Sequence, residues 1–420
     1  MNKNFWCRNI LLAIGMSLIW QPSVAQELAA NETVANRYRP ALDPLGIRVG
    51  GFQLFPELEI AAVQNDNIFA REDDKTSDVT YVFEPRIELT SNWSRHALDA
   101  GVHAAIRRFR DNGGEDHEDY TIWAGGRVDV SRSGHLASEM RHARRHEDRE
   151  SPNDLQGLER TAFDVNSVAV SYRIRPDVNR LYARLEGEYR DFAFEDTLGP
   201  SGLINNADRD RRVLSGTLRL GYAPTPYYSL FLQAETRSTR YDDQIDDAGF
   251  QRDSDADEIS FGVAVDYSGL IFGDIFVGRR SDKYSDPRFA DIDGSSFGAN
   301  LAWNITGLTT LSISGRRSVE PTTIVDVSGI VETRFGLRVD HELRRNLILG
   351  LEWSKVDEDF DGILRKDDID TVDFSARYLM NRRAELVLAY SHRDRDSSPV
   401  TATGFRYSRD MISLSARIHW

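Results

Sequence analysis

The sequence predicts an all-β fold, a transmembrane antiparallel β-barrel, and three observations support this prediction. The chain ends on a strictly alternating stretch, with Ile412, Leu414, Ala416, Ile418 and Trp420 on one face and polar residues on the other. Alternation with a period of two is typical of a half-buried strand and not of a helix. A terminal strand ending in an aromatic residue is typical of the strand that closes an outer-membrane barrel, although a soluble β-sandwich could end in the same way. The other two observations are an export signal and a regular alternation of short and long connections.

Residues 1–25 predict a signal peptide. Lys3 and Arg8 precede a short apolar core at residues 10–20, and small residues at 23–25 form a plausible cleavage site. The apolar core is too short to span a bilayer as a helix. The only cysteine, Cys7, lies in this removable segment, so we expect the mature chain to contain no disulfide.

The composition excludes some functions. The formal net charge is −15, and removing Lys3 and Arg8 with the signal peptide makes it −17. Phosphate contacts need a basic surface, so we expect no nucleic-acid partner. No segment of the mature chain approaches the ~18 consecutive apolar residues that a membrane helix requires. The 28% of charged residues suits a barrel with a wet lumen, because only alternate residues of each strand face lipid.

The mature chain divides into an N-terminal segment and a barrel. Residues 26–50 contain Pro40, Pro44 and Gly46 without a clear period, which predicts a periplasmic segment, extended or partly inside the barrel. Residues 51–420 contain alternating stretches of ~10–13 residues, as transmembrane strands require. The main apolar faces, in chain order, are Leu54, Leu58 and Ile60; Val79, Tyr81, Phe83, Ile87 and Leu89; Leu98, Ala100, Val102, Ala104 and Ile106; Val168, Val170, Tyr172 and Ile174; Leu214, Leu218, Leu220 and Tyr222; Ile259, Phe261, Val263, Val265 and Tyr267; Phe297, Ala299, Leu301 and Trp303; Phe335, Leu337 and Val339; Leu347, Leu349, Leu351 and Trp353; and Leu386, Leu388 and Tyr390.

The connections between these stretches alternate in length. Eight short turns lie near 91–94, 131–135, 175–179, 223–226, 268–270, 305–308, 342–345 and 381–383. Nine longer, mostly acidic loops lie near 64–77, 111–118, 147–160, 192–208, 242–255, 284–294, 320–329, 357–369 and 396–407. This pattern predicts about 18 strands, with 16 as the alternative, short periplasmic turns and long extracellular loops. A β-sandwich does not explain such regular alternation.

Two stretches deviate from the pattern. Pro85 lies in the middle of a predicted strand, where it removes a ladder hydrogen bond, and we expect a β-bulge there. Residues 136–146 alternate weakly and are basic, which predicts a shortened strand.

The face opposite the apolar one carries charges of both signs. Dry burial of such charges would cost several kcal/mol each, so the interior is either an aqueous channel or a fully paired polar core. A barrel of ~16–18 strands leaves room for a channel. Guanidinium groups bind carboxylates in a bidentate manner and could guide anionic solutes such as uronic-acid polymers, or they could pair with neighbouring acids and only stiffen the wall. The candidate guiding residues are Arg107, Arg127, Arg184, Arg219, Arg237, Arg316, Arg338 and Arg377.

One segment has the spacing of a calcium-binding loop. Its carboxylates are Asp357, Asp359, Asp361 and Asp368, with a glycine after the third. Basic residues intrude and the flanks alternate like strands, so a solvated acidic hairpin is the alternative. We expect no other cofactor.

The histidines have no serine-hydrolase or metal-ligand spacing, so we expect no enzyme. A barrel hydrolase built from spatially assembled residues is the remaining alternative.

Short landmarks along residues 43–420 resemble the outer-membrane β-barrel porin family found with exopolysaccharide and capsule biosynthesis systems. The landmarks are residues 43–48 (DPLGIR), 65–69 (NDNIF), 93–96 (WSRH), 146–149 (HEDR), 269–273 (GLIFG) and 339–343 (VDHEL). The resemblance implies the outer membrane of a Gram-negative cell and a part in secreting or assembling surface polysaccharide. We expect as partners the membrane lipid, the barrel-assembly machinery through the C-terminal strand, and polysaccharide export components. A general diffusion porin for small hydrophilic solutes is the alternative function.

Overall fold

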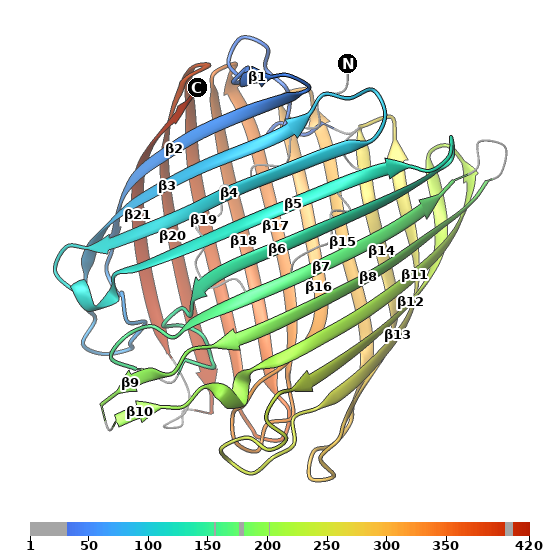
Figure 1. Cartoon of the computed structure of the whole chain (residues 1–420). Helices are drawn as coiled ribbons and strands as arrows, with labels where there is room; N and C mark the ends of the chain where they lie inside the picture. The colour runs from blue at the N-terminus through green and yellow to red at the C-terminus, as the bar shows by residue number, and fades with distance from the viewer. Residues whose placement is uncertain (1–31, 155–156, 176–179, 201, 400–405) are drawn as a thin grey trace.

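The computed structural model describes residues 32–154, 157–175, 180–200, 202–399 and 406–420, and these form a closed antiparallel barrel of 18 strands (Figure 1). The barrel strands are β2 (Phe52–Asn65), β3 (Asp78–Ser91), β4 (Ala97–Phe109), β5 (His117–Asp129), β6 (Gly134–His146), β7 (Ala162–Ile174), β8 (Leu181–Phe194), β11 (Arg211–Thr225), β12 (Tyr228–Tyr241), β13 (Ser254–Tyr267), β14 (Ile271–Tyr284), β15 (Ile292–Thr306), β16 (Thr309–Glu320), β17 (Ile330–Arg344), β18 (Leu347–Phe360), β19 (Lys366–Asn381), β20 (Ala384–Ser398) and β21 (Tyr407–His419). The predicted fold class and the count of 18 are confirmed.

The barrel closes between its first and last strands. β2 and β21 are antiparallel, with Leu58 opposite Ile418 and Ala62 opposite Leu414. Closure gives every strand two neighbours, so the sheet presents no free edge to lipid. Within the described ranges, no helix is long and apolar enough to cross a membrane.

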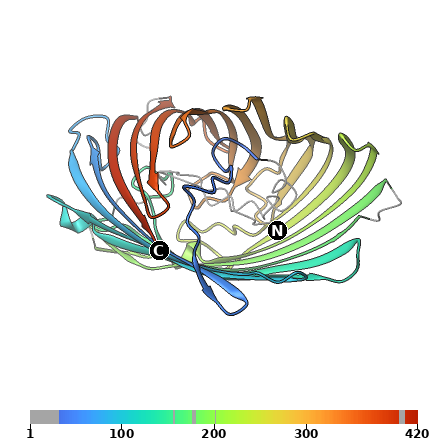
Figure 2. The ribbon, with the colours of Figure 1, turned by 90° about the horizontal axis from the view of Figure 1, so that it is seen from above.

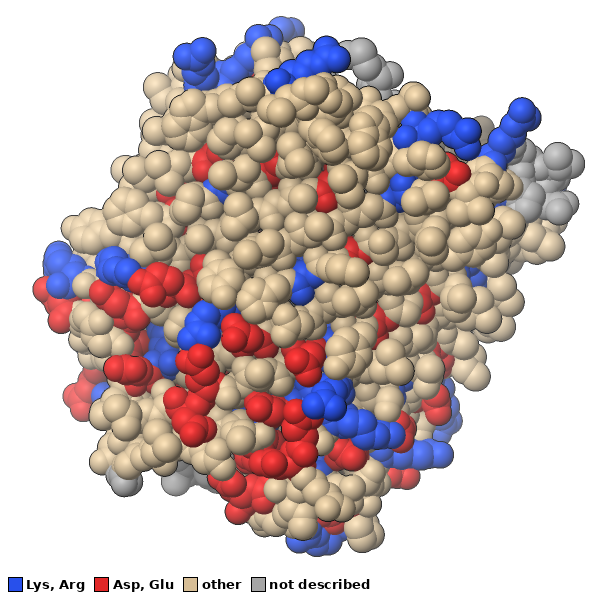
Figure 3. Space-filling model, in the orientation of Figure 1, with Lys and Arg blue, Asp and Glu red and all other residues tan. Residues whose placement is uncertain are grey.

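The outer wall carries an apolar band. Large apolar side chains point outward with much of their surface exposed, for example Ile122 (52%), Val277 (66%) and Leu414 (59%). Figure 3 shows this band as an almost uncharged zone toward the rim with the chain termini, whereas acidic and basic side chains cover the part of the wall near the opposite rim. So much exposed apolar surface is stable only when lipid covers it.

The two rims differ as predicted. The seven short turns that are described in full lie at the rim that also holds the first described residues and the C-terminus, and the described parts of the long loops lie at the other rim (Figure 1). One loop is much shorter than expected. The predicted loop 357–369 is reduced to residues 361–365, because β18 and β19 stay paired as far as Asp359 and Lys366.

The two deviating stretches are more regular than predicted. Pairing of β3 with β4 skips the positions around Pro85, but Phe83 still faces Ile106 and Arg86 still faces His103. The register is the same on both sides of the gap, so no residue is inserted and the predicted bulge is wrong. The shortened strand at 136–146 is also wrong, since β6 is 13 residues long. Its outward Arg144 lies on the charged part of the wall and pairs with Glu195 at 2.8 Å.

Smaller elements lie at the two ends of the barrel. At the turn rim, β1 (Ile47–Val49) pairs with the beginning of β2. In the loop between β8 and β11, β9 (Thr197–Gly199) and β10 (Gly202–Ile204) form a hairpin, followed by the short helix η2 (Ala207–Arg209). The short helix η1 (Gly113–Glu115) lies between β4 and β5.

The N-terminal segment enters the barrel at the turn rim. Val34 is fully buried against Ile348 and Leu379, which point inward from β18 and β19. Its amide donates to Thr310 Oγ1 at 2.9 Å, and Arg39 pairs with Glu342 at 2.9 Å. Figure 2 shows the first described residues, in blue, crossing part of this opening. The predicted signal peptide lies outside the described residues.

Candidate functional site: the lumen

The eight candidate guiding arginines are on the inner wall, and most of them are already paired. Six form an ion pair with an acid: Arg107 with Asp119 (3.0 Å), Arg127 with Asp129 (3.1 Å), Arg184 with Glu186 (2.5 Å), Arg219 with Asp274 (2.9 Å), Arg237 with Glu235 (3.2 Å) and Arg338 with Asp340 (2.9 Å). Arg377 donates to the carbonyl of Ala35 at 3.1 Å, and Arg316 makes no ion pair with a described residue. Pairing of this kind stiffens the wall and occupies the guanidinium groups. Paired arginines alone are therefore not evidence for guidance of solutes, and a further feature of the lumen is needed.

That feature is a row of basic side chains across four neighbouring strands. His135 of β6 is directly opposite Arg173 of β7, Arg173 is opposite Arg184 of β8, and Arg184 is opposite Arg219 of β11. We call these four residues the basic row. Like charges directly opposite each other on neighbouring strands destabilise a sheet. The three arginines of the row therefore repel one another, although Arg184 and Arg219 are each paired with an acid.

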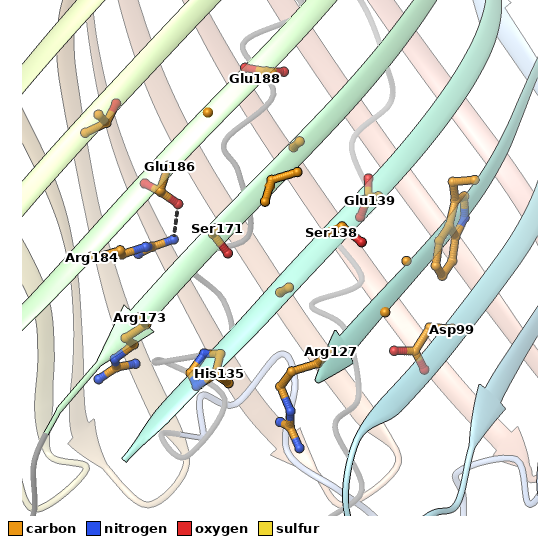
Figure 4. Close-up of a pocket in the computed structure, with 18 of the residues that line it drawn as sticks. Asp99, Arg127, His135, Ser138, Glu139, Ser171, Arg173, Arg184, Glu186 and Glu188 are labelled. Carbon is orange, nitrogen blue, oxygen red and sulfur yellow. Dashed lines mark ion pairs between the residues drawn. The ribbon is translucent and has the colours of Figure 1, made fainter. Parts of the chain in front are cut away.

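Acids lie beside the basic row rather than within it. Figure 4 shows Arg184 directed toward Glu186, with Arg173 and His135 on the neighbouring strands. Arg219 is held by Asp274, by Gln233 Oε1 at 2.9 Å and over the ring of Phe231 at 4.0 Å. The guiding residues predicted from the sequence include Arg184 and Arg219 but not His135 or Arg173, because only the strand register shows that the four lie at one level.

A second feature is a loop that crosses the lumen. Residues 147–154 and 157–161, which we call the crossing loop, leave the wall between β6 and β7. The carboxylate of Glu150 meets Arg393, Arg409 (2.8 Å) and the hydroxyl of Tyr407 (2.7 Å) on β20 and β21. Four strands, β2 to β5, separate β21 from β6 at the base of the loop, and β20 lies one strand further away. The loop therefore spans the interior as a chord.

Its contacts reach even further across the barrel. Asn153 accepts a hydrogen bond from Thr322, in the loop between β16 and β17, at 2.7 Å. Near its base, Arg149 and Arg160 pair with Glu115 at 2.6 and 2.9 Å. These contacts brace the crossing loop on three sides.

The charges that hold the crossing loop persist at physiological pH. Burial alone would raise the pKa of Glu150, but Arg393 and Arg409 outweigh it and lower the pKa to about 2. Burial likewise opposes ionisation of Glu115, and Arg149 and Arg160 outweigh it, so that its pKa is also lowered. The loop is thus anchored by ionised carboxylates whose partners are nearby guanidinium groups.

Other loops brace the same mouth. Arg252, in the loop 242–253, is buried and pairs with Asp246 at 2.7 Å. It also donates to the carbonyls of Val327 (2.5 Å) and Ile324 (3.0 Å) in the loop 321–329. Loops from well-separated strands are therefore joined, and the width of the extracellular opening is determined by loops as well as by the wall.

The predicted calcium ligands do not converge. Asp357 and Asp368 are opposite each other on β18 and β19, and Lys355 pairs with both, at 3.3 and 3.2 Å. Asp359 pairs instead with Lys366 at 2.7 Å, while Asp361 accepts a hydrogen bond from Ser328 at 2.6 Å. Among the described residues there is no group of three or more His, Cys, Asp or Glu that could hold a metal ion. Calcium binding stays a prediction from the spacing, without geometric support.

The closed barrel, its apolar outer band and its charged interior define an outer-membrane, porin-like channel protein. The family model described as "Putative beta-barrel porin 2" matches residues 39–420, and the chain belongs to this family. No curated protein matches the sequence.

Several solved structures of Pseudomonas aeruginosa proteins are similar to this chain at low sequence identity. OccK1 (OpdK) is 11% identical with a TM-score of 0.48, covering 87% of this chain and 99% of its own. OccK3 (OpdO) is 15% identical with a TM-score of 0.45, covering 89% and 96%. A mutant of the ferric enterobactin receptor PfeA is 9% identical with a TM-score of 0.45, covering 87% and 80%. These likenesses concern the barrel fold alone.

Proposed function

We propose that the protein is a passive channel for anionic hydrophilic solutes, and that it supports the export or assembly of a surface exopolysaccharide containing carboxylate sugars. The observation that supports this proposal best is the basic row, His135, Arg173, Arg184 and Arg219. Neighbouring strands are ~4.8 Å apart, so the row extends for about 15 Å along the wall. A chain of carboxylates passing along it would meet a guanidinium at each of three successive strands.

The acids beside the row make the binding reversible. A carboxylate of the solute can replace Glu186 at Arg184 or Asp274 at Arg219, because guanidinium binds each of these groups in the same way. The arginine is never left without a partner, so the solute gains little from stopping at any one of them. Conduction requires sites of this kind, which attract a solute without retaining it.

The crossing loop sets the size limit in this proposal. Its chord from β6 and β7 to Arg393 and Arg409 divides the extracellular mouth, so we expect extended chains and small solutes to pass and folded molecules to be excluded. Insertion of the barrel into the membrane depends on the terminal strand in this proposal, because β21 is the segment that we expect the barrel-assembly machinery to recognise.

Planar-bilayer recording under a salt gradient tests anion guidance. We expect the wild-type protein to prefer anions and the double variant Arg173→Gln/Arg184→Gln to lose most of this preference. The matched control is Arg212→Gln/Arg240→Gln, which removes two exposed arginines near the long loops with the same change of charge. A wild-type channel that prefers cations, or equal reversal potentials for the two double variants, would refute the proposal.

A deletion strain tests the cellular role and separates it from general diffusion. We expect loss of surface polysaccharide with unchanged uptake of small neutral solutes. Reduced uptake with intact polysaccharide would instead favour a general diffusion porin, the alternative function.

A further inference from the structure

The fully described short turns at the periplasmic rim carry only basic charge. Seven turns are fully described, residues 92–96, 130–133, 226–227, 268–270, 307–308, 345–346 and 382–383, and none contains Asp or Glu. They contain Arg95, Arg132, Arg345, Arg382 and Arg383. The opposite rim differs strongly: the loop 242–253 alone has five Asp and one Arg. In a chain with a net charge of −15, the seven described turns of this rim therefore carry only positive charge.

Four of these arginines have no role in holding the barrel together. Arg95, Arg132, Arg345 and Arg383, the turn arginines, are exposed, and none makes a side-chain hydrogen bond or ion pair with another described residue. The fifth, Arg382, donates to the carbonyl of Pro40 at 2.6 Å and fixes the N-terminal segment. Figure 3 shows basic side chains along this rim with few acids beside them.

The turn arginines lie at the border of the apolar band. Val130, Leu343 and Met380 point outward with 59%, 54% and 50% of their surface exposed, and each lies within three residues of a turn arginine. Trp93, 47% exposed, is two residues before Arg95. Outward apolar and aromatic residues thus continue up to the turns, and this places the guanidinium groups at the depth of lipid headgroups.

The turn arginines also occupy one continuous part of the perimeter. Their turns join β17 to β18, β19 to β20, β3 to β4 and β5 to β6, which are neighbouring strands through the closure of β21 on β2. The three described turns on the other side, residues 226–227, 268–270 and 307–308, carry no charge. Solubility alone would not confine the charge to one arc.

We propose that the turn arginines form a binding surface for anionic phospholipids of the periplasmic leaflet. Guanidinium forms paired hydrogen bonds with phosphate oxygens, and an anionic headgroup supplies a phosphate at this depth. The neighbouring Val130, Leu343 and Trp93 favour lipid over peptidoglycan or a soluble partner, because these side chains would insert among acyl chains. The inference does not depend on which solute the lumen conducts.

Lipid retention by the purified barrel tests this surface. The variant Arg95→Gln/Arg132→Gln/Arg345→Gln/Arg383→Gln is compared with the control Arg71→Gln/Arg110→Gln/Arg212→Gln/Arg240→Gln, which removes four exposed arginines of the opposite rim. Each protein is titrated in detergent with phosphatidylglycerol or phosphatidylcholine, and bound lipid is counted by native mass spectrometry. Each basic residue strengthens binding to an anionic surface about fivefold. We therefore expect the affinity of the turn variant for phosphatidylglycerol to fall about tenfold or more.

The controls define the outcomes. Heat-modifiable migration in a gel shows that each variant is folded, and phosphatidylcholine binding should be the same in all proteins. Equal phosphatidylglycerol retention by the two variants would overturn the proposal. So would a turn variant that keeps its lipid but loses binding to purified peptidoglycan, or one that changes only in ion selectivity.

Discussion

Glu150 is the residue whose change should alter the channel most. Replacing it by Gln removes the carboxylate that faces Arg393 and Arg409, while the side chain keeps its shape and one hydrogen-bond acceptor. The two guanidinium groups then lie buried beside a neutral amide. We expect the crossing loop to leave β20 and β21 and the extracellular mouth to widen.

Two arguments give the free energy with which Glu150 anchors the crossing loop. Lowering the pKa of Glu150 from 4.5 to about 2 corresponds to about 3 kcal/mol in favour of the anchored, ionised state. Removing one partner of a buried ion pair typically costs ~3–5 kcal/mol. Both values exceed the thermal energy severalfold, so a loop that was anchored nearly all the time should become detached for a large fraction of the time.

Single-channel recording measures the effect. We expect Glu150→Gln to raise the mean conductance and the current noise at pH 7, while Glu159→Gln, an exposed acid of the same loop, should behave like the wild type. Equal conductance of Glu150→Gln and the wild type, with both proteins heat-modifiable, would show that the crossing loop does not limit the pore.

The pH dependence gives an independent check of the same reasoning. Because the folded-state pKa of Glu150 is below its ordinary value, the anchor stabilises the loop fully above pH 4.5 and loses that effect as the pH falls toward 2. The wild-type conductance should therefore stay constant from pH 8 to about 5 and rise below about pH 4. A rise between pH 7 and 6 would point to a histidine instead.

Three further predictions concern the wall and the rims. Val34→Asp places a carboxylate against Ile348, so the N-terminal segment should detach and become accessible to protease while the barrel stays heat-modifiable. Gly262→Ala forces a methyl group to within 2.2 Å of the Phe231 ring and 2.5 Å of a backbone carbonyl, so we expect a loss of ~1–3 kcal/mol, measured by urea unfolding in lipid vesicles. Calcium should not change the melting temperature of the wild type or of Asp359→Asn, because Asp357, Asp359 and Asp368 are paired with lysines and Asp361 with Ser328.

The sequence predicts the barrel well because each strand can be recognised from its own alternation of apolar and polar residues. Alternation assigns side chains such as Leu414 and Ser415 to opposite faces without any knowledge of the neighbours. The turns are short enough to fix antiparallel pairing locally. The errors occurred where local rules compete with the sheet. Pro85 was expected to need a bulge, but the barrel tolerates a gap in the ladder between β3 and β4 without a change of register.

The lumen was only partly predictable, since its function depends on register and on contacts distant in sequence. The sequence identified inward arginines such as Arg184 and Arg219, but only the register of β6, β7, β8 and β11 places them in one row with His135 and Arg173. Glu150 lies 259 residues from Arg409 in the chain, in a segment that was predicted only as one of the long extracellular loops. No local pattern distinguishes an acid that anchors a loop from one that is exposed to water.

The basic row and the turn arginines differ in whether their charges have acidic partners, and this difference predicts their roles. In the basic row, Arg184 and Arg219 each have an acid within 3 Å, so the wall tolerates the repulsion and a passing carboxylate need only exchange with an existing partner. Arg345 and Arg383 at the turns make no ion pair with a described residue, and their solvent-exposed position makes a fixed partner unnecessary for folding. Exchange suits transport, which requires weak and repeated contacts. An unpaired charge at headgroup depth suits retention, because each phosphate it binds adds an interaction that the protein alone does not provide.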